Sequence, residues 1–224
     1  MPPPHPRRVG LLDLLIPPAC AGCGRGGALL CRPCLDTFAP PGRTDDRFVG
    51  PDPGAVVGDA LGLALAAFAY RGPMRRALAA LKYTGASRLA PILARAALPA
   101  LGPLLAVTGP CALVAVPVHP QRRRERGYDQ AELLARSLGA QTAVTVMPCL
   151  ERIRPTTKQH RLDRAARLAN LRGAFGVTSG VVVPPVVILV DDIITTTATL
   201  EACAAVLRDG GAGAVYGFAV AREV

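Results

Sequence analysis

The chain has 224 residues, half of them apolar, and a formal net charge of +10 at pH 7. This length accommodates one core of ordinary size and a small accessory module, because most domains contain ~100–200 residues. Uninterrupted apolar runs such as LGLALAAFAY and GVVVPPVVILV are much shorter than the ~20 residues of a membrane-spanning helix, so we expect no membrane insertion. No small-residue cleavage site precedes the first Cys-x-x-Cys, which predicts a cytoplasmic protein without a secretion signal.

Four cysteines near the N-terminus form two Cys-x2-Cys pairs, Cys20 with Cys23 and Cys31 with Cys34. Two such turns can close a tetrahedral zinc site with no open coordination position, which indicates a structural metal. The alternative is a pair of disulfides in an exported protein, which the missing export signal disfavours. We therefore predict a zinc-knuckle module in residues 1–40 that is too small to form a core without its metal. The remaining cysteines lie in apolar contexts that predict core positions: Cys111, Cys149 and Cys203.

Beyond a Pro- and Gly-rich linker at 41–60, strand and helix patterns alternate along the chain. Aliphatic runs predict strands at 61–72, 112–118, 143–150, 184–192 and 214–221. Helical patterns occupy 73–85, 87–101 with a proline break, 128–140 and 198–212. The arginine-rich segment 119–127 is predicted to be a loop. This alternation predicts an α/β domain over residues 61–224, with a parallel sheet covered on both faces.

Positive charge is concentrated between residues 121 and 172, where twelve Lys and Arg accompany five Asp and Glu. Such a stretch is either a solvated face of an arginine-rich protein or a site for polyanions, such as phosphate, pyrophosphate or nucleic acid. Composition leaves both alternatives open. The polar motifs elsewhere in the chain are needed to choose between them.

The stretch VVILVDDIITTTATL places two acids at the expected carboxyl end of a strand, where open α/β sheets bind their ligands. The threonine-rich turn then begins a helix, whose free amides and dipole favour an anion, and the hydroxyls of Thr195, Thr196 and Thr199 add donors. Asp191 and Asp192 can accept hydrogen bonds from ribose hydroxyls, so the arrangement fits a sugar phosphate. The alternative is an ordinary strand-to-helix turn with capping aspartates.

ILVDDIITTTATL resembles the 5-phosphoribosyl-1-pyrophosphate (PRPP) loop of type I phosphoribosyltransferases. The four-cysteine N-terminus and the motifs YRGPMRRALAALKYTG, VPVHPQRRRERGYDQAELLA and RPTTKQHRLDRAARLANLRGAF extend the similarity. Together they make the chain similar to the ComF competence family over nearly its whole length. The resemblance implies a type I phosphoribosyltransferase-like parallel sheet flanked by helices, with a small N-terminal four-cysteine zinc module, and binding of PRPP with magnesium.

The resemblance also implies roles for particular residues. Asp191 and Asp192 would be the catalytic carboxylates that hold the ribose hydroxyls. The 5′-phosphate would be wrapped by a turn comprising Thr195, Thr196, Thr197, Ala198 and Thr199. The diphosphate would be contacted by Arg122, Arg123, Arg126 and Gly127. Lys82 is either a further cation of the site or a lysine favoured by the dipole at a helix C-terminus. A hood loop over the site would comprise Arg154, Thr156, Gln159, Arg167 and Asn170.

Two positions depart from the family pattern and leave turnover open. Thr197 stands where the family has glycine, and a β-branched residue is poorly tolerated if the position requires positive φ or close approach to phosphate. Asp129 stands where asparagine is usual, and a carboxylate beside a diphosphate would repel it unless a cation intervenes.

Two kinds of function are compatible with these patterns. The first is an enzyme that transfers phosphoribose from PRPP to an unidentified nitrogen nucleophile, or that hydrolyses PRPP. The second is a non-catalytic PRPP sensor that binds single-stranded DNA and acts with DNA-uptake proteins in natural transformation. With four Tyr, five Phe and no Trp, few rings can stack on bases, so strand binding would rest mainly on phosphate contacts.

Overall fold

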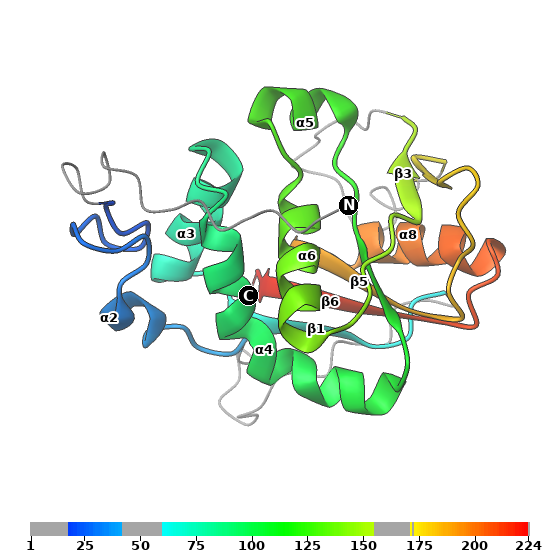
Figure 1. Cartoon of the computed structure of the whole chain (residues 1–224), viewed down its shortest axis with the longest axis horizontal. Helices are drawn as coiled ribbons and strands as arrows, with labels where there is room; N and C mark the ends of the chain where they lie inside the picture. The colour runs from blue at the N-terminus through cyan, green and yellow to red at the C-terminus, as the bar shows by residue number, and fades with distance from the viewer. Residues whose placement is uncertain (1–17, 42–59, 155–170, 172, 224) are drawn as a thin grey trace.

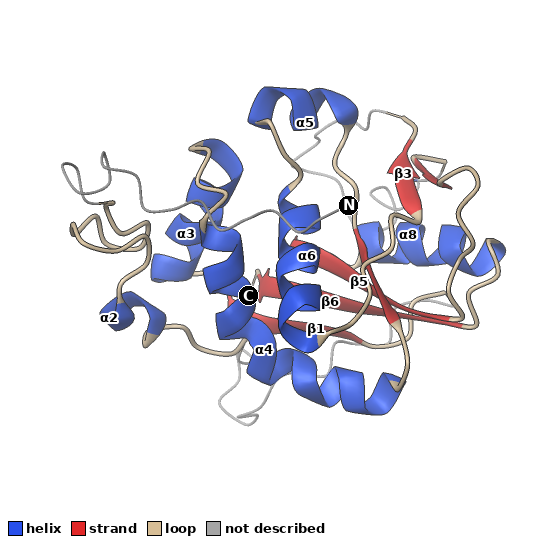
Figure 2. Ribbon diagram, viewed as in Figure 1, coloured by secondary structure: helices blue, strands red, loops and turns tan. Residues whose placement is uncertain are grey.

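The computed structural model describes residues 18–41, 60–154, 171 and 173–223. Its centre is a four-stranded sheet in the order β1-β6-β5-β2, in which every pair of neighbours is parallel. The strands are β1 (Ala64–Ala69), β2 (Ala112–Ala115), β5 (Val186–Ile194) and β6 (Ala214–Arg222). Helices lie on both sides of the sheet (Figures 1 and 2), which confirms the predicted α/β class.

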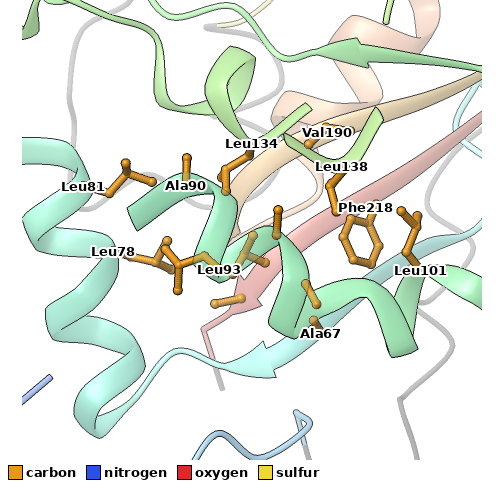
Figure 3. Close-up of a cluster of buried hydrophobic side chains, with 14 of the residues drawn as sticks. Ala67, Leu78, Leu81, Ala90, Leu93, Leu101, Leu134, Leu138, Val190 and Phe218 are labelled. Atoms are coloured by element: carbon orange, nitrogen blue, oxygen red, sulfur yellow. The ribbon is translucent and has the colours of Figure 1, made fainter. Parts of the chain in front are cut away.

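The strands are apolar on both faces because both faces are buried. Along β5, Ile188 and Val190 belong to one buried cluster, whereas Val187 and Leu189 belong to the cluster on the opposite face. This alternation follows from the pleat of a strand, and burial of both faces explains the almost continuous aliphatic sequence. Figure 3 shows the first cluster, which includes Phe218 of β6.

One face of the sheet is covered by α3 (Gly72–Tyr83), α4 (Leu89–Thr108) and α6 (Gln130–Thr142), whose buried side chains share the first cluster. The other face is covered by α8 (Ala198–Asp209), whose buried side chains belong to the second. Because β5 and β6 are adjacent and parallel, with α8 between them in the sequence, the predicted β-α-β unit is confirmed. Figure 1 shows α6 crossing in front of the sheet.

The predicted proline break in the second helix is wrong. Helix α4 continues through Pro99 and Pro103, and both prolines lie on its exposed side. A proline inside a helix costs a backbone hydrogen bond and bends the helix. The fully buried Leu101 and Leu104 hold the second half of α4 on the sheet, so burial on the inner side outweighs this cost.

By length and composition α4 is also apolar enough to cross a membrane. A third of the residues in its most apolar stretch are buried inside the protein. The count of uninterrupted apolar runs misses this segment because Arg95 and the prolines divide it. Leu93, Ala94 and Ala97 are nevertheless fully buried against the sheet. The inner side of α4 is thus part of the protein core.

The arginine-rich segment predicted as a loop is instead the helix α5 (Pro120–Arg126). Pro120 occupies the first turn, and the His119 side chain accepts a hydrogen bond from the Gln121 amide at 3.3 Å. Gly127, with φ 79°, ends the helix in the left-handed conformation that glycine adopts at little cost. Arginine is itself a good helix former, so the start and stop signals indicated a helix that the prediction overlooked.

The cysteine-rich segment packs directly on α3. Cys20 and Cys34 belong to the same buried cluster as Met74, and Arg76 Nε donates a hydrogen bond to the Gly22 carbonyl. The segment is therefore an extension of the main core. The predicted linker lies almost entirely outside the described residues.

A second, two-stranded sheet lies beside α8. It pairs β3 (Leu150–Arg152) with β4 (Phe175–Val177) in antiparallel fashion, and Leu150 and Phe175 are buried in the second cluster. The strand predicted at 143–150 is reduced to a single parallel bridge between Leu113 and Val146, followed by β3. Four predicted hood residues lie outside the described part of the chain: Thr156, Gln159, Arg167 and Asn170.

Candidate functional site

The two acids of the stretch VVILVDDIITTTATL, Asp191 and Asp192, lie inside β5 and not at its end. The pairing of β2 stops at Ala115, opposite Val190, and the Val116 amide makes a last bond to the Val190 carbonyl at 2.9 Å. On the other side, β6 continues beside β5 as far as Ile194. The carboxylates therefore follow the point where β2 leaves the sheet, toward the carboxyl ends of the strands, where open α/β sheets bind ligands.

Lys82, in the last turn of α3, forms an ion pair with Asp192. Lys82 Nζ lies 2.8 Å from Asp192 Oδ2, and the side chains are only 19% and 5% exposed. Burial by itself would lower the pKa of Lys82, but the charge and hydrogen bond of Asp192, with Asp191 nearby, outweigh it and raise that pKa. Lys82 is thus a charged counter-ion of the carboxylate pair, which the helix-dipole alternative does not describe.

Asp191 carries an excess of negative charge around it. Its Oδ1 accepts a hydrogen bond from the Asp192 amide at 2.7 Å. Burial and the neighbouring charge of Asp192 raise the pKa of Asp191 well above its ordinary value, although Lys82 and the amide bond oppose the shift. A carboxylate in this position gains from any ligand that brings hydroxyl donors or positive charge. We call Asp191, Asp192 and Lys82 the carboxylate centre.

The threonine turn begins α8, as predicted. Thr197 is the N-cap residue, and its side chain makes no capping hydrogen bond. Thr195 is exposed, Thr196 and Thr199 are half-buried, and Ala198 is buried in the core. The first amides of α8 have no carbonyl partner within the helix, and they follow the two acids closely along the chain. A helix start of this kind favours an anion.

Thr197 shows no backbone strain in this conformation. Its φ is −73° and its ψ is −2°, in the ordinary right-handed region. The only non-glycine residue with positive φ in the described ranges is Ala143. In the structure described, the Thr197 position therefore requires no positive φ.

The predicted diphosphate arginines of α5 point to different partners. Arg123 forms an ion pair with Glu132 of α6 at 3.1 Å. Arg126 donates to Gln130 Oε1 at 2.8 Å and lies over the exposed ring of Tyr83, 5.3 Å from its centroid. These contacts hold α5 against α6 and α3. Figure 1 shows α5 at one extremity of the molecule, with β3 to one side.

Arg152 of β3 is a site residue that the sequence patterns did not reveal. Its guanidinium stacks over the Phe175 ring at 5.2 Å. It also interacts electrostatically with Arg122 of α5 and with Asp191, and burial followed by the Arg122 charge lowers its pKa. The charges of Arg122 and Asp191 both act on Arg152, which links α5 and β3 electrostatically to the carboxylate centre. The available signal was the alternation in β3, which places Arg152 on the same side as the buried Leu150. Arg154, of the predicted hood, is exposed beside this strand.

Asp129 contacts backbone amides and has a structural role. Its Oδ1 accepts from the amides of Ala131 at 2.9 Å and Glu132 at 3.3 Å, and its Oδ2 accepts from the Val118 amide at 2.9 Å. It therefore caps α6 and fixes the chain that follows β2. Both carboxylate oxygens are used, whereas an asparagine side chain offers a single acceptor oxygen. Burial, partly opposed by these amides, raises the pKa of Asp129.

The four N-terminal cysteines come together around the short helix α2 (Arg32–Leu35). Their sulfur atoms all lie within 4.8 Å of one another. Cys20 Sγ and Cys23 Sγ are 3.5 and 3.6 Å from Cys31 Sγ. These separations are close to the ~3.8 Å between sulfurs that surround a metal tetrahedrally at ~2.3 Å. All seven cysteines lie in the described ranges and are free, so the disulfide alternative is wrong and the cluster can hold one metal ion.

The backbone around Cys20 favours its thiolate form, whereas burial and hydrogen bonds with the other cysteines raise the pKa of Cys34 to about 12. The amides of Gly22 and Cys31 donate to Cys20 Sγ, each at 3.3 Å. Burial raises the pKa of Cys20, but backbone donors outweigh it and lower that pKa to about 6. A Cβ at Gly22 would lie 2.7 Å from Cys34 Sγ, so the turn has room only for glycine. The thiolate is the form that binds metal.

The other cysteines lie apart from this cluster. Cys149 and Cys203 are fully buried, as predicted, and Cys111 is half-buried. Burial and then the charge of Asp191 raise the pKa of Cys203 well above its ordinary value.

No protein-family model matches the chain, and no curated protein matches it significantly. A function is therefore argued from the motifs and from the geometry of the described residues.

Proposed function

We propose that the chain binds PRPP at the β5–α8 connection and belongs with the type I phosphoribosyltransferase-like proteins of the ComF competence family. One observation carries this proposal: the two acids of β5, Asp191 and Asp192, and the free amides at the start of α8 follow each other closely along the chain. A ribose 5-phosphate presents hydroxyls and a phosphate on one small molecule. Asp191 would accept from the ribose hydroxyls, and the turn from Thr195 to Thr199 would donate to the 5′-phosphate.

The cations near the centre support the diphosphate half of the proposal. The charges of Arg122 and Arg152 oppose each other: after burial, the charge of Arg122 is the next cause of the lowered pKa of Arg152. A diphosphate between them would relieve that repulsion, and guanidinium groups bind phosphate oxygens through paired donors. Arg123 and Arg126 would act indirectly, because their contacts with Glu132 and Gln130 position α5.

Two metals belong to this proposal. Magnesium, with its preference for carboxylate and phosphate oxygens, would neutralise the charge of the diphosphate leaving group. Asp191 would be the carboxylate that holds it, because Asp192 is engaged by Lys82. Zinc is the metal that suits four thiolates in closed tetrahedral geometry, so we assign it to Cys20, Cys23, Cys31 and Cys34 as a structural ion.

The chemistry of such a site depends on positioning and electrostatics. In a transfer reaction, the bond from the ribose to the diphosphate breaks and the acceptor nitrogen, or water, forms the new bond. Asp191 and the α8 turn would hold the ribose phosphate in place, and Arg122 with Arg152 would stabilise the charge on the departing diphosphate. Which nucleophile attacks depends on the hood residues and on the acceptor.

Calorimetric titration with PRPP and Mg²⁺ tests the proposal. We expect the parent chain to bind with a Kd of about 1–100 μM, in the range common for enzyme substrates. The double variant Asp191→Asn/Asp192→Asn should show no binding at concentrations ~100-fold higher, while circular dichroism shows an intact fold. Asp209→Asn, at the far end of α8, is the matched control and should bind like the parent. Equal binding by the double variant and the parent would show that PRPP does not use this site.

A second function, sensing PRPP while binding single-stranded DNA, is favoured by the exposed surface near α5. Tyr83 is 67% exposed, and Arg126 lies over its ring, which places an aromatic ring in a cationic surface. Rings in such surfaces stack on bases, at ~1–3 kcal/mol per base. With labelled oligo-dT, Tyr83→Ala should weaken binding by about 5- to 100-fold, and log K should fall linearly with log salt. Pyrophosphate release on adding PRPP identifies the enzyme; PRPP binding without release identifies the sensor.

A further inference from the structure

A groove of about 1310 Å³ lies between the cysteine-rich segment and the helices α4 and α6. One wall is formed by Leu35 of α2 and by Phe38, the other by Leu133 of α6, and Ile92 of α4 and Phe68 of β1 lie between them. None of the residues of the carboxylate centre lines it. Sites for small molecules usually have volumes of ~300–1,000 Å³. The groove is larger than this range, and its walls of helical residues suit a segment of polypeptide.

The composition of α4 has an explanation in this groove. The inner side of α4 packs on the sheet, while Pro91, Ile92, Ala96 and Pro99 on its outer side line the groove. The helix is therefore apolar on both sides, although only its inner side is covered by the described chain. Extended apolar surfaces of this kind mark sites of interaction. Arg95 is the only charged residue of α4, and it too lines the groove.

The charges around the groove are unbalanced. Three arginines line it, one from each helix: Arg32 of α2, Arg95 of α4 and Arg136 of α6. The only acid in the lining is Asp36, which pairs with Arg32 at 2.7 Å. Arg136 pairs with Glu132 at 2.7 Å, whereas Arg95 has no carboxylate partner in the described part of the chain. An occupant with carboxylates beside its apolar side chains would complement this lining.

We propose that the groove binds an acidic amphipathic helix of a partner protein. Its apolar side chains, spaced three and four residues apart, lie against Phe38, Ile92 and Leu133, and its carboxylates face Arg95 and Arg136. The wall formed by α2 is held in place by the cysteine cluster, because Cys31 is the N-cap residue of this short helix and Cys34 lies within it. The cluster thereby gives the groove its shape.

The test measures binding of labelled model peptides to the full chain by fluorescence anisotropy. One peptide is a helix of about four turns with a leucine stripe and glutamates elsewhere; the second has lysines in place of the glutamates; the third is a scramble of the first. We expect the acidic peptide to bind with a Kd of about 1–50 μM, and the other two at least ~10-fold more weakly.

Groove variants locate the binding. Arg95→Glu should weaken the acidic peptide by about 10-fold and strengthen the lysine peptide, because it reverses the unpaired charge. Ile92→Asp should abolish binding of both. The control is Arg75→Glu, an exposed charge of α3 outside the groove, which should leave both affinities unchanged. Arg95 is exposed, so its variant retains the fold, and thermal melts verify this for both groove variants.

Three results would overturn the proposal. The first is equal binding of the acidic and lysine peptides, or acidic binding that Arg95→Glu does not change. The second is an acidic-peptide affinity that rises ~10-fold or more in the full chain carrying Leu12→Asp and Leu15→Asp, which would identify the apolar stretch LLDLLI of this chain as a competing occupant. The third is self-association that sedimentation detects and Arg95→Glu abolishes, which would make a second copy the occupant.

Discussion

The cysteine cluster and the carboxylate centre both gather groups that repel one another when ionised, but they are assembled differently. The cluster lies within residues 20–34, and all four of its potential ligand atoms are cysteine sulfurs. The carboxylate centre brings Lys82 to Asp192 from different halves of the sequence, so it contains its own counter-ion. We expect the first arrangement to depend on a metal, whereas the second depends on the tertiary fold. Four substitutions, with expected effects from large to small, test these two arrangements and the turn that follows β5.

The largest effect is expected for Cys34→Ser. Cys34 is buried against α3 and offers a sulfur to the cluster, so the change removes a metal ligand and disturbs the shared core. We expect the free energy of unfolding, measured in urea with equimolar zinc, to fall by about 4 kcal/mol or more. Cys111→Ser, outside the cluster, should cost about 1 kcal/mol. Equal losses in the two variants, or a parent chain that contains no metal after purification with zinc, would contradict the metal dependence.

The next effect is expected for Lys82→Met, which leaves the two carboxylates without their cation. The raised pKa of Lys82 keeps this side chain charged in the folded state. Its contribution to stability is therefore fully present at pH 7, and it is lost only as the pH rises from the ordinary pKa of lysine through the raised pKa of Lys82. We expect unfolding in urea at pH 7 to be easier by about 3 kcal/mol. The loss should shrink toward lower pH, as Asp191, whose pKa is raised, takes up a proton.

The control for this variant is Arg75→Met, which removes an exposed cation from the same helix. It should change the unfolding free energy by less than about 0.5 kcal/mol. If Lys82→Met cost no more than the control, the ion pair would contribute nothing to the fold.

The third effect is a gain of stability in Asp191→Asn. The folded-state pKa of Asp191 is raised above its unfolded value, so the folded state binds this proton more tightly than the unfolded state. Parent stability therefore falls as the pH rises from the unfolded pKa through the folded one. We expect Asn to raise the unfolding free energy by about 1 kcal/mol at pH 7 and to have no effect below the unfolded pKa.

Thermal melts over a pH series measure this gain, with the Asp209→Asn variant as the comparison. PRPP titration of the same Asp191→Asn protein should show weaker binding, so that stability and binding change in opposite directions. A loss of stability at pH 7 would mean that the Asp191 carboxylate is compensated in the folded chain.

The smallest effect is expected for Thr197→Gly. The Thr197 hydroxyl makes no capping bond, and its φ of −73° is accessible to both residues. We expect the unfolding free energy to change by only a few tenths of a kcal/mol. Thr199→Gly, inside the first turn of α8, should cost about 1 kcal/mol. A larger loss for Thr197→Gly than for Thr199→Gly would show that the Thr197 side chain stabilises the turn.

Local patterns predicted a large part of the molecule. The aliphatic runs gave strands β1, β2, β5 and β6, because a strand buried on both faces must be apolar throughout. The cysteine spacing predicted the cluster, since each Cys-x2-Cys turn directs two sulfurs to one point. The threonine turn was predicted to begin a helix, and α8 begins at Ala198. In each case the cause lies within a few residues of its effect.

Errors arose where a distant contact outweighed a local signal. Burial of Leu101 and Leu104 carries α4 through two prolines. Pairing with β6 extends β5 two residues beyond the acids. The sequence left the role of Asp129 open, and the fold engages its oxygens with the amides of Val118 and of α6.

The sequence by itself determined the strand and helix periods, the cysteine cluster and the presence of acids followed by a threonine turn, because each depends on neighbours along the chain. Only the tertiary structure decided that Lys82 pairs with Asp192, that Arg123 is engaged by Glu132 and that Arg152 joins the site. Only the tertiary structure, too, aligned three arginines along one apolar groove. The physical reason is that a charge acts over a few ångströms of space whatever its separation along the chain. Which charges meet is therefore fixed by the packing of helices on the sheet.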